Sequence, residues 1–212
     1  MKNRFVIGAA VLLSLAILSN TARADLVLHW TFDETTGTTA YDGSAHGLVH
    51  NGTLYGTGGW SSSPAKAGGA FATNTTSTAN YGYVATAHQP DLAFGANDFS
   101  VSFWVYKLMN GDDPAQYHNI WGVTKWVDGS SANSEWLVSL SSDNKPAFSI
   151  STASGSADNR SVKSTSELSL NQWYHLVAVR EGTGMYLYVD GELAASNATA
   201  LSSGASVMNA DT

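Results

Sequence analysis

The chain has 212 residues, of which 13% are charged, and its formal net charge is −7. The length favours one domain, and the acidic balance argues against a nucleic-acid partner, because such partners are bound through basic side chains. The chain has no cysteine, which excludes disulfides and thiolate chemistry, so a hydrophobic core, with or without a metal ion, must stabilise the fold.

Residues 1–24 have the parts of a secretory signal peptide. Lys2 and Arg4 give a positive start, an apolar run follows, and a small-x-small motif ends at Ala24. The apolar run is shorter than the ~20 residues that span a bilayer, so a membrane anchor is the less favoured alternative. We predict cleavage after Ala24, a mature chain that starts at Asp25 without a membrane span, and a secreted or cell-surface location.

The first half of the mature chain predicts short strands joined by ordered turns. Residues 26–32 are expected to form the first strand, and 70–73 and 81–85 are expected to pair with each other. The stretch 56–69 is rich in Gly, Ser and Ala, as a linker between two domains would be. However, Trp60 supplies apolar area that linkers lack, so we expect this stretch to belong to a single domain.

The second half of the chain carries the stronger strand patterns. Residues 98–107 alternate, with apolar side chains on one face and Ser102, Trp104 and Tyr106 on the other, a face suited to a ligand-binding surface. Further strands are expected at 120–127, 136–140, 147–151 and 162–165.

Residues 171–196 indicate two consecutive β-hairpins. Both faces of 173–180 are largely apolar, which favours a central strand that is covered on both sides. The two glycines in 181–184 and the Asp190-Gly191 pair supply the positive φ angles that hairpin turns need. The strands that return after these turns are 185–189 and 192–196.

Four stretches share their order and spacing with a known family: WTFDE at 30–34, DFSVSFWV at 98–105, NQWYHLVAV at 171–179 and LYVDGEL at 187–193. They resemble the laminin-G-like jelly-roll domain of the concanavalin A-like lectin/glucanase superfamily, in the form found in secreted bacterial proteins. The resemblance implies an all-β fold, a two-sheet antiparallel jelly-roll β-sandwich, over residues 25–200. The regular spacing of strands and turns favours the same class of fold.

The end of the chain departs from this family. The resemblance leads us to expect a closing strand with an acidic and aromatic segment, and residues 201–212 are instead small and polar. We therefore expect a polar tail there and a sandwich that lacks its last strand. Two explanations stay open: the chain is a piece of a longer protein, or its last strand is divergent.

Catalysis is not expected, although the superfamily includes glucan hydrolases. Glycoside cleavage needs two suitably spaced carboxylates, and the E-x-D-x-x-E pattern of the superfamily's retaining glucanases is absent. The acidic grouping that comes nearest, Asp190 with Glu192, flanks a hairpin turn.

Aromatic side chains are the main candidates for ligand binding, because exposed rings on a sheet can stack on sugar faces. For each ring, packing in the core is the alternative. The candidates are Trp104, Tyr106, Trp121, Trp126 and Trp136.

Asp33, Glu34 and Asp42 are the candidate metal ligands. Calcium prefers oxygen ligands, and the resemblance adds that related domains often carry a structural ion. The alternative is that the aspartates only cap turns. His46 and His50 lie four residues apart, but in a glycine-bearing loop this spacing gives little support to a transition-metal site.

These patterns predict a non-catalytic, secreted or cell-surface module for recognition or adhesion that forms part of a larger protein. It is expected to bind a glycan or a protein partner, such as a polysaccharide or a cell-surface glycoprotein. The alternatives are a divergent glycan-active enzyme of the same fold and a structural spacer in a surface protein.

His175, on a strand with apolar neighbours, is expected to be a hydrogen-bonded histidine of the core or sheet.

Overall fold

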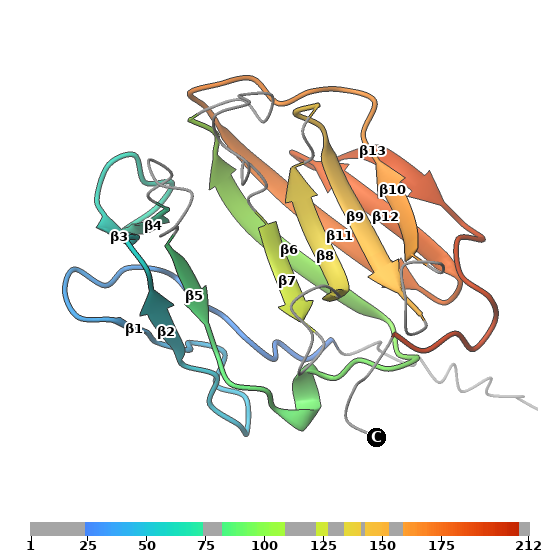
Figure 1. Ribbon diagram of the computed structural model, residues 1–212, viewed down its shortest axis with the longest axis horizontal. Helices are drawn as coiled ribbons and strands as arrows, with labels where there is room; N and C mark the ends of the chain where they lie inside the picture. The colour runs from blue at the N-terminus through green and yellow to red at the C-terminus, as the bar shows by residue number, and fades with distance from the viewer. Residues whose placement is uncertain are drawn as a thin grey trace, which may run out of the picture.

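The fold is all-β, with two four-stranded antiparallel sheets at its centre (Figure 1). The structure is a computed structural model, and it describes residues 24–73, 82–108, 122–126, 134–140, 143–152 and 159–207. Most of the expected signal peptide therefore lies outside the described residues. Across the described residues, no helical segment has the length and hydropathy needed to cross a bilayer.

One four-stranded sheet has the order β13-β12-β11-β6. The other has the order β10-β9-β8-β7, and the two sheets lie one over the other in Figure 1. The strands of the first sheet are β6 (Phe99–Tyr106), β11 (Trp173–Glu181), β12 (Gly184–Val189) and β13 (Glu192–Asn197). Those of the second are β7 (Gly122–Trp126), β8 (Ser134–Leu140), β9 (Pro146–Ser151) and β10 (Asn159–Lys163).

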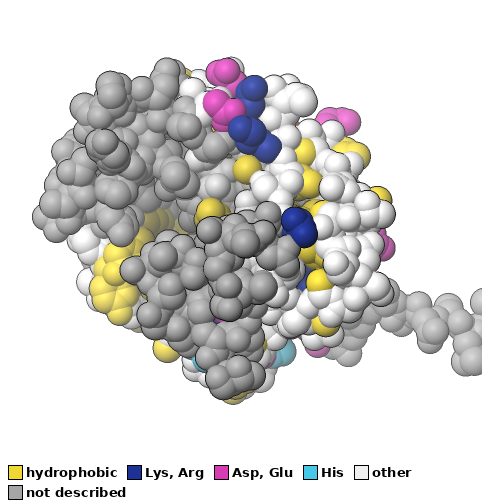
Figure 2. All heavy atoms as spheres, turned by 45° about the vertical axis from the view of Figure 1, so that its right-hand side comes forward, with side chains coloured by type: hydrophobic (Ala, Val, Ile, Leu, Met, Phe, Trp, Pro, Cys, Tyr) yellow, Lys and Arg dark blue, Asp and Glu magenta, His cyan; other side chains and the backbone are white. Residues whose placement is uncertain are grey.

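The main core lies between these two sheets. Strand alternation sends every second side chain inward from each sheet. The buried apolar side chains form two clusters: a small one of Leu140, Leu168 and Tyr174, and the main one. Its residues on strands are Phe99, Trp136, Val138, Phe148, Ile150, Val162, Ala178, Met185 and Leu187. Figure 2 shows that charged side chains are sparse among the described residues on the face it draws, in line with the low charged fraction of the sequence.

The N-terminal part forms two smaller sheets beside the sandwich (Figure 1). β2 lies between β1 and β5, and β3 pairs with β4 in a hairpin that we call the β3–β4 arm. The bounds are β1 (Thr39–Ala40), β2 (Gly52–Tyr55), β3 (Gly59–Ser61), β4 (Ala70–Ala72) and β5 (Tyr83–Ala85), with one 3-10 turn, η1 (Pro90–Leu92).

The expected pairing of residues 70–73 with 81–85 is wrong, because each strand has an aromatic partner elsewhere. Phe71 on β4 lies opposite Trp60 on β3, with ring centroids 6.0 Å apart. Tyr83 on β5 lies opposite Tyr55 on β2, and these rings stack at 5.1 Å. Such aromatic pairs across strands stabilise a sheet.

The expected strand at 26–32 is also wrong. Within it, only an isolated bridge joins Trp30 to Asp42. Phe32 has φ of 58°, a left-handed conformation that costs a bulky residue on the order of 1–3 kcal/mol and ends an extended strand. In this conformation the Phe32 ring packs against Trp30, Trp60 and Phe71, at centroid distances of 5.9 to 6.2 Å.

The two predicted hairpins at 171–196 are confirmed, and β11 has a strand on each side, as expected. Asp190 and Gly191 have φ of 51° and 86°, which is the positive pair that a type I′ turn requires.

Residues 201–207, which begin the expected polar tail, pack against the sandwich. Leu201 and Val207 are buried in the main core, with 4% and 1% of their surface exposed. Buried Arg180 on β11 donates hydrogen bonds to the carbonyls of Gly95 and Ala205. These contacts join the segment after β13 to the loop before β6.

Candidate functional site

On the face that points away from the core, the paired strands β6 and β11 carry four rings. Trp104 on β6 lies opposite His175 on β11, and their rings stack with centroids 4.8 Å apart and an interplanar angle of 24°. The adjacent pair, Tyr106 and Trp173, has ring centroids 5.4 Å apart. We call these four side chains the aromatic face.

Trp104 is exposed because of the alternation of β6. Its neighbours Phe103 and Val105 pack against the two core clusters, so the period of two turns Trp104 outward, and 45% of its surface is exposed. Lys66, on the loop of the β3–β4 arm, places Nζ 4.1 Å from the centroid of the Trp104 ring, within the range of a cation–π contact. The exposed indole therefore has a defined position.

His175 is fixed by two hydrogen bonds. Nε2 shares a hydrogen bond of 2.8 Å with Ser102 Oγ, and the backbone N–H donates to Asp190 Oδ1, also at 2.8 Å. The expectation of a hydrogen-bonded sheet histidine is confirmed. The same contacts hold the imidazole against the Trp104 ring.

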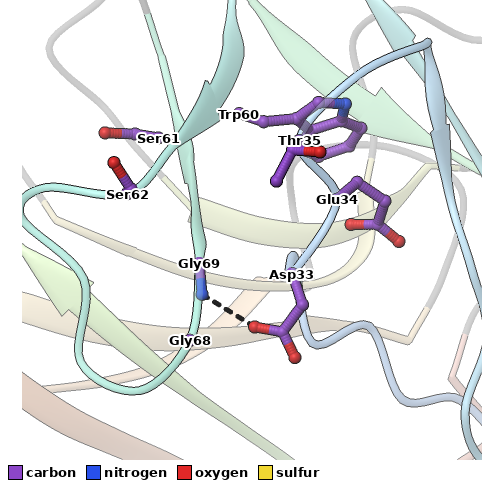
Figure 3. Close-up of a pocket in the computed structure, with 8 residues that line it drawn as sticks. All are labelled: Asp33, Glu34, Thr35, Trp60, Ser61, Ser62, Gly68 and Gly69. Atoms are coloured by element: carbon purple, nitrogen blue, oxygen red, sulfur yellow. Dashed lines mark hydrogen bonds between the residues drawn. The ribbon is translucent and has the colours of Figure 1, made fainter.

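A pocket of about 320 Å³ lies between the segment that follows Phe32 and the β3–β4 arm (Figure 3). Trp60 brings an indole to it, and Asp33 and Glu34 bring two adjacent carboxylates. We call this cavity the Trp60 pocket. The residues that line it are Asp33, Glu34, Thr35, Trp60, Ser61, Ser62, Gly68 and Gly69.

Each carboxylate of the Trp60 pocket has one oxygen bonded to the backbone. Asp33 Oδ1 accepts a hydrogen bond of 2.7 Å from the Gly69 N–H, which Figure 3 draws as a dashed line. Glu34 Oε1 accepts one of 2.8 Å from the Tyr41 N–H. Glu34 Oε2 is buried and has no hydrogen-bond partner among the described residues. The pocket thus holds negative charge beside an aromatic wall.

A third group joins Asp42, His50 and Asp91 through their side chains. The fully buried His50 ring has Nε2 3.0 Å from Asp91 Oδ1 and Nδ1 3.4 Å from Asp42 Oδ2. On the other side of Asp91, His46 Nε2 lies 3.2 Å from Oδ2. The chain of alternating carboxylates and imidazoles joins the loop before β2 to η1.

Asp42 organises this loop as a multiple hydrogen-bond acceptor. It accepts the backbone N–H groups of His29, Ser44 and His50 at 2.9 to 3.0 Å, and the Ser44 hydroxyl at 3.0 Å. Burial alone would raise the pKa of Asp42, but the hydrogen bonds from His50, Ser44 and His29 outweigh it and hold this pKa well below its ordinary value.

The comparisons with known proteins place the fold in a family. A family model described as "Concanavalin A-like lectin/glucanases superfamily" matches residues 77–209. The chain belongs to this superfamily. Among solved structures, it is similar to an S-layer domain-containing protein (residues 221–444) from Clostridium thermocellum ATCC 27405, at 22% identity and a TM-score of 0.48, over 82% of this chain and 73% of that chain. No curated protein matches the chain.

The superfamily match confirms the resemblance and the jelly-roll class, and the structure places three of the five predicted aromatic residues. Trp104 and Tyr106 belong to the aromatic face. Trp136 is in the core, with 8% of its surface exposed. Trp121 and the side chain of Trp126 lie outside the described residues.

Sequence reasoning did not select Trp173, His175 and Lys66 for the aromatic face. The alternation of residues 173–180 could have indicated Trp173 and His175, since it places them on one face. The position of Lys66 over Trp104 depends on how the β3–β4 arm folds back, for which the sequence gives no signal.

The three predicted calcium ligands divide between two places. Asp33 and Glu34 line the Trp60 pocket, whereas the Asp42 oxygens accept hydrogen bonds in the loop before β2. Within the described ranges, no group of three or more carboxylate or imidazole side chains is arranged to hold a metal ion. Calcium binding therefore stays a prediction, and only Asp33 and Glu34 share a cavity.

Asp190 and Glu192, the candidates for divergent catalysis, lie at the turn between β12 and β13. Asp190 Oδ1 accepts the His175 N–H and so has a structural contact. Because the superfamily includes both lectins and glucanases by its description, membership alone does not decide between binding and catalysis.

Proposed function

We propose that this protein is a non-catalytic recognition module that binds glycans of polysaccharides or cell-surface glycoproteins through its aromatic face. The observation that carries the proposal is the exposed Trp104 indole, stacked beside His175 and next to the Tyr106–Trp173 pair. Sugar rings have apolar faces that pack on flat aromatic surfaces. Polar groups around such a surface then fix orientation.

Polar groups that could fix the orientation of a bound sugar lie next to the rings. Ser102 and His175 offer hydrogen-bonding atoms on the same face of the sheet, and Lys66 places an ammonium over the Trp104 ring. The signal-peptide pattern adds a location, since a secreted or surface-exposed module of a larger protein meets glycans outside the cell.

The test is binding of the full chain to a polysaccharide panel, with the Trp104→Ala variant alongside. We expect roughly tenfold weaker binding, because loss of one central aromatic contact typically costs more than 1 kcal/mol. Tyr41→Ala, which removes an exposed ring elsewhere, serves as the matched control and should leave binding unchanged. Equal binding by wild type and Trp104→Ala, or no binding to any glycan, would contradict the proposal.

Two alternatives predict different results in the same panel. A divergent enzyme would depolymerise laminarin-like or alginate-like chains and would lose that turnover in Asp190→Asn and Glu192→Gln variants. A structural spacer would bind none of the glycans and would still unfold cooperatively.

A further inference from the structure

The Trp60 pocket is separate from the aromatic face. None of its lining residues belongs to the aromatic face, and the two sites lie on different elements: the pocket on the segment after Phe32 and the β3–β4 arm, the face on β6 and β11. Figure 3 shows Asp33, Glu34 and Thr35 on one segment, with Trp60, Ser61 and Ser62 on the arm opposite. The proposed glycan site leaves this cavity without a role.

Close backbone packing fixes the acidic side of the pocket. A Cβ atom added to Gly68 would lie 2.0 Å from Asp33 Oδ1, and one added to Gly69 would lie 2.3 Å from the Phe32 carbonyl oxygen. Gly68 also has φ of 64°, which favours glycine. With the 2.7 Å hydrogen bond from the Gly69 N–H, this packing holds the Asp33 carboxylate against the arm in one position.

The aromatic side of the pocket is equally fixed. The Trp60 indole N–H donates to the Gly37 carbonyl at 2.9 Å, and the ring packs against Phe32 and Phe71. Because these contacts fix the orientation of the indole, it loses little conformational entropy when a ligand binds.

The charge of the pocket is not neutralised by the described residues. No lysine or arginine among them forms an ion pair with Asp33 or Glu34, and the ammonium of Lys66, on the same arm, lies over Trp104 instead. Glu34 Oε2 is buried without a hydrogen-bond partner, so its charge acts in a medium that screens it weakly. A positive group that enters beside Asp33 therefore meets a carboxylate that has no ion-pair partner among the described residues.

We propose that the Trp60 pocket binds the protonated primary amine of an amino sugar. The ammonium would meet the exposed Asp33 carboxylate and the face of the Trp60 indole, since carboxylates and indole faces both attract cations. The sugar ring would fill the rest of the cavity, whose size is at the lower end of small-ligand pockets. Ser62 and the glycine backbone supply hydrogen-bonding groups for its hydroxyls.

A protonated amine fits the lining of the Trp60 pocket better than a calcium ion or a neutral sugar does. Calcium takes 6 to 8 oxygen ligands, and the described residues bring no third carboxylate to Asp33 and Glu34. A neutral sugar would leave the negative charge of the pocket uncompensated. The amine matches both the charge and the aromatic wall.

The experiment compares glucosamine with N-acetylglucosamine, which has the same ring but no charge on its nitrogen, by NMR titration of the full chain. The readout is the indole N–H signal of Trp60, assigned from its loss in a Trp60→Phe variant. We expect glucosamine to shift this signal and to bind about three- to tenfold more tightly than N-acetylglucosamine, as one charge contact and one cation–π contact allow. The preference should weaken with added salt.

The decisive variant is Asp33→Asn, whose side-chain oxygen still accepts from the Gly69 N–H while the charge is lost. The preference for glucosamine should disappear in it and persist in Asp143→Asn, which removes a carboxylate that pairs with Lys163 elsewhere. Equal affinity for both sugars would overturn the proposal, and so would an unchanged preference in Asp33→Asn.

The outcome is independent of the proposed glycan site. Trp173→Ala removes a ring of the aromatic face and leaves the contact of Lys66 with Trp104 in place, so it should leave the glucosamine titration unchanged while it weakens binding of the polysaccharide. Loss of glucosamine binding in Trp173→Ala would assign the amine to the aromatic face and overturn its assignment to the Trp60 pocket.

Discussion

At the scale of single residues, the same type of side chain is exposed on one strand and buried on another. Trp104 is exposed on β6, and Trp136 is buried on β8. Alternation in the sequence correctly grouped Ser102, Trp104 and Tyr106 on one face, because the period of two is a local property. It could not place Trp136, since the inward face is set by the sheet that packs opposite.

Asp42 is the residue whose removal should alter stability in a pH-dependent way. Its folded-state pKa lies below the ordinary value of 3.8, so its contribution is fully present above that value and is lost as the pH falls below it. Asp42→Asn removes a negative charge that accepts hydrogen bonds from three backbone N–H groups and one hydroxyl. The substitution should lower the free energy of unfolding by on the order of 2 kcal/mol at pH 7.

Urea unfolding of wild type and Asp42→Asn from pH 7 down to pH 3 checks this expectation. The gap between their free energies of unfolding should be constant above about pH 5 and should begin to narrow below pH 4, because only the wild type loses the charged acceptor. A gap that does not depend on pH would show that the charge of Asp42 contributes nothing. Asp143→Asn, at an exposed ion pair, serves as the control.

At the scale of elements, the strands of the β13-β12-β11-β6 sheet were predictable and the short N-terminal strands were not. β6, β11, β12 and β13 start and end within one residue of the predicted bounds, because each has clear alternation or a defined turn beside it. The short N-terminal strands are only two to four residues long. Their pairing depends on contacts between distant aromatic residues, which local patterns do not encode.

The segment after β13 is the element whose contribution the sequence most underestimated. Leu201 and Val207 appear among small polar residues, and yet both are buried in the main core. Leu201→Ala should lower the free energy of unfolding by about 2 to 4 kcal/mol, and Val207→Ala by somewhat less, because each removes buried methyl groups and leaves a cavity.

Thermal or urea unfolding measures both effects, with Ser203→Ala as the control at an exposed position of the same segment. Wild-type stability in Leu201→Ala and Val207→Ala would mean that this segment does not pack on the sandwich in solution. In that case the expectation of a polar tail from residue 201 would hold.

At the scale of the whole molecule, the sandwich followed from the sequence, whereas the sites did not. Many short strands with low charge indicate an all-β sandwich or barrel, and the family resemblance selects the two-sheet sandwich. The Trp60 pocket instead joins the segment after Phe32 to residues 60–69, and the position of that arm depends on the left-handed Phe32 and on glycines that permit close approach. Local sequence patterns do not indicate which of these distant segments lie close together in the fold.

Removal of residues 1–24 should leave the described fold intact. Residues 24–26 are exposed, and the first residue with a bridge is Trp30, so removal of 1–24 takes no residue from the described core. It also removes Lys2, Arg4 and Arg23, which leaves 7 basic against 17 acidic residues and changes the net charge from −7 to −10.

Expression with export, followed by intact mass and N-terminal sequencing, should identify a mature chain that begins Asp25-Leu26-Val27. Ala24→Phe places a large side chain where the peptidase requires a small one, and should leave the precursor uncleaved or shift the cut to another site. A full-length chain recovered from the membrane fraction in the wild type would instead identify residues 1–24 as an anchor. Because the mature chain carries the larger negative charge, it should also migrate as the more acidic species in isoelectric focusing.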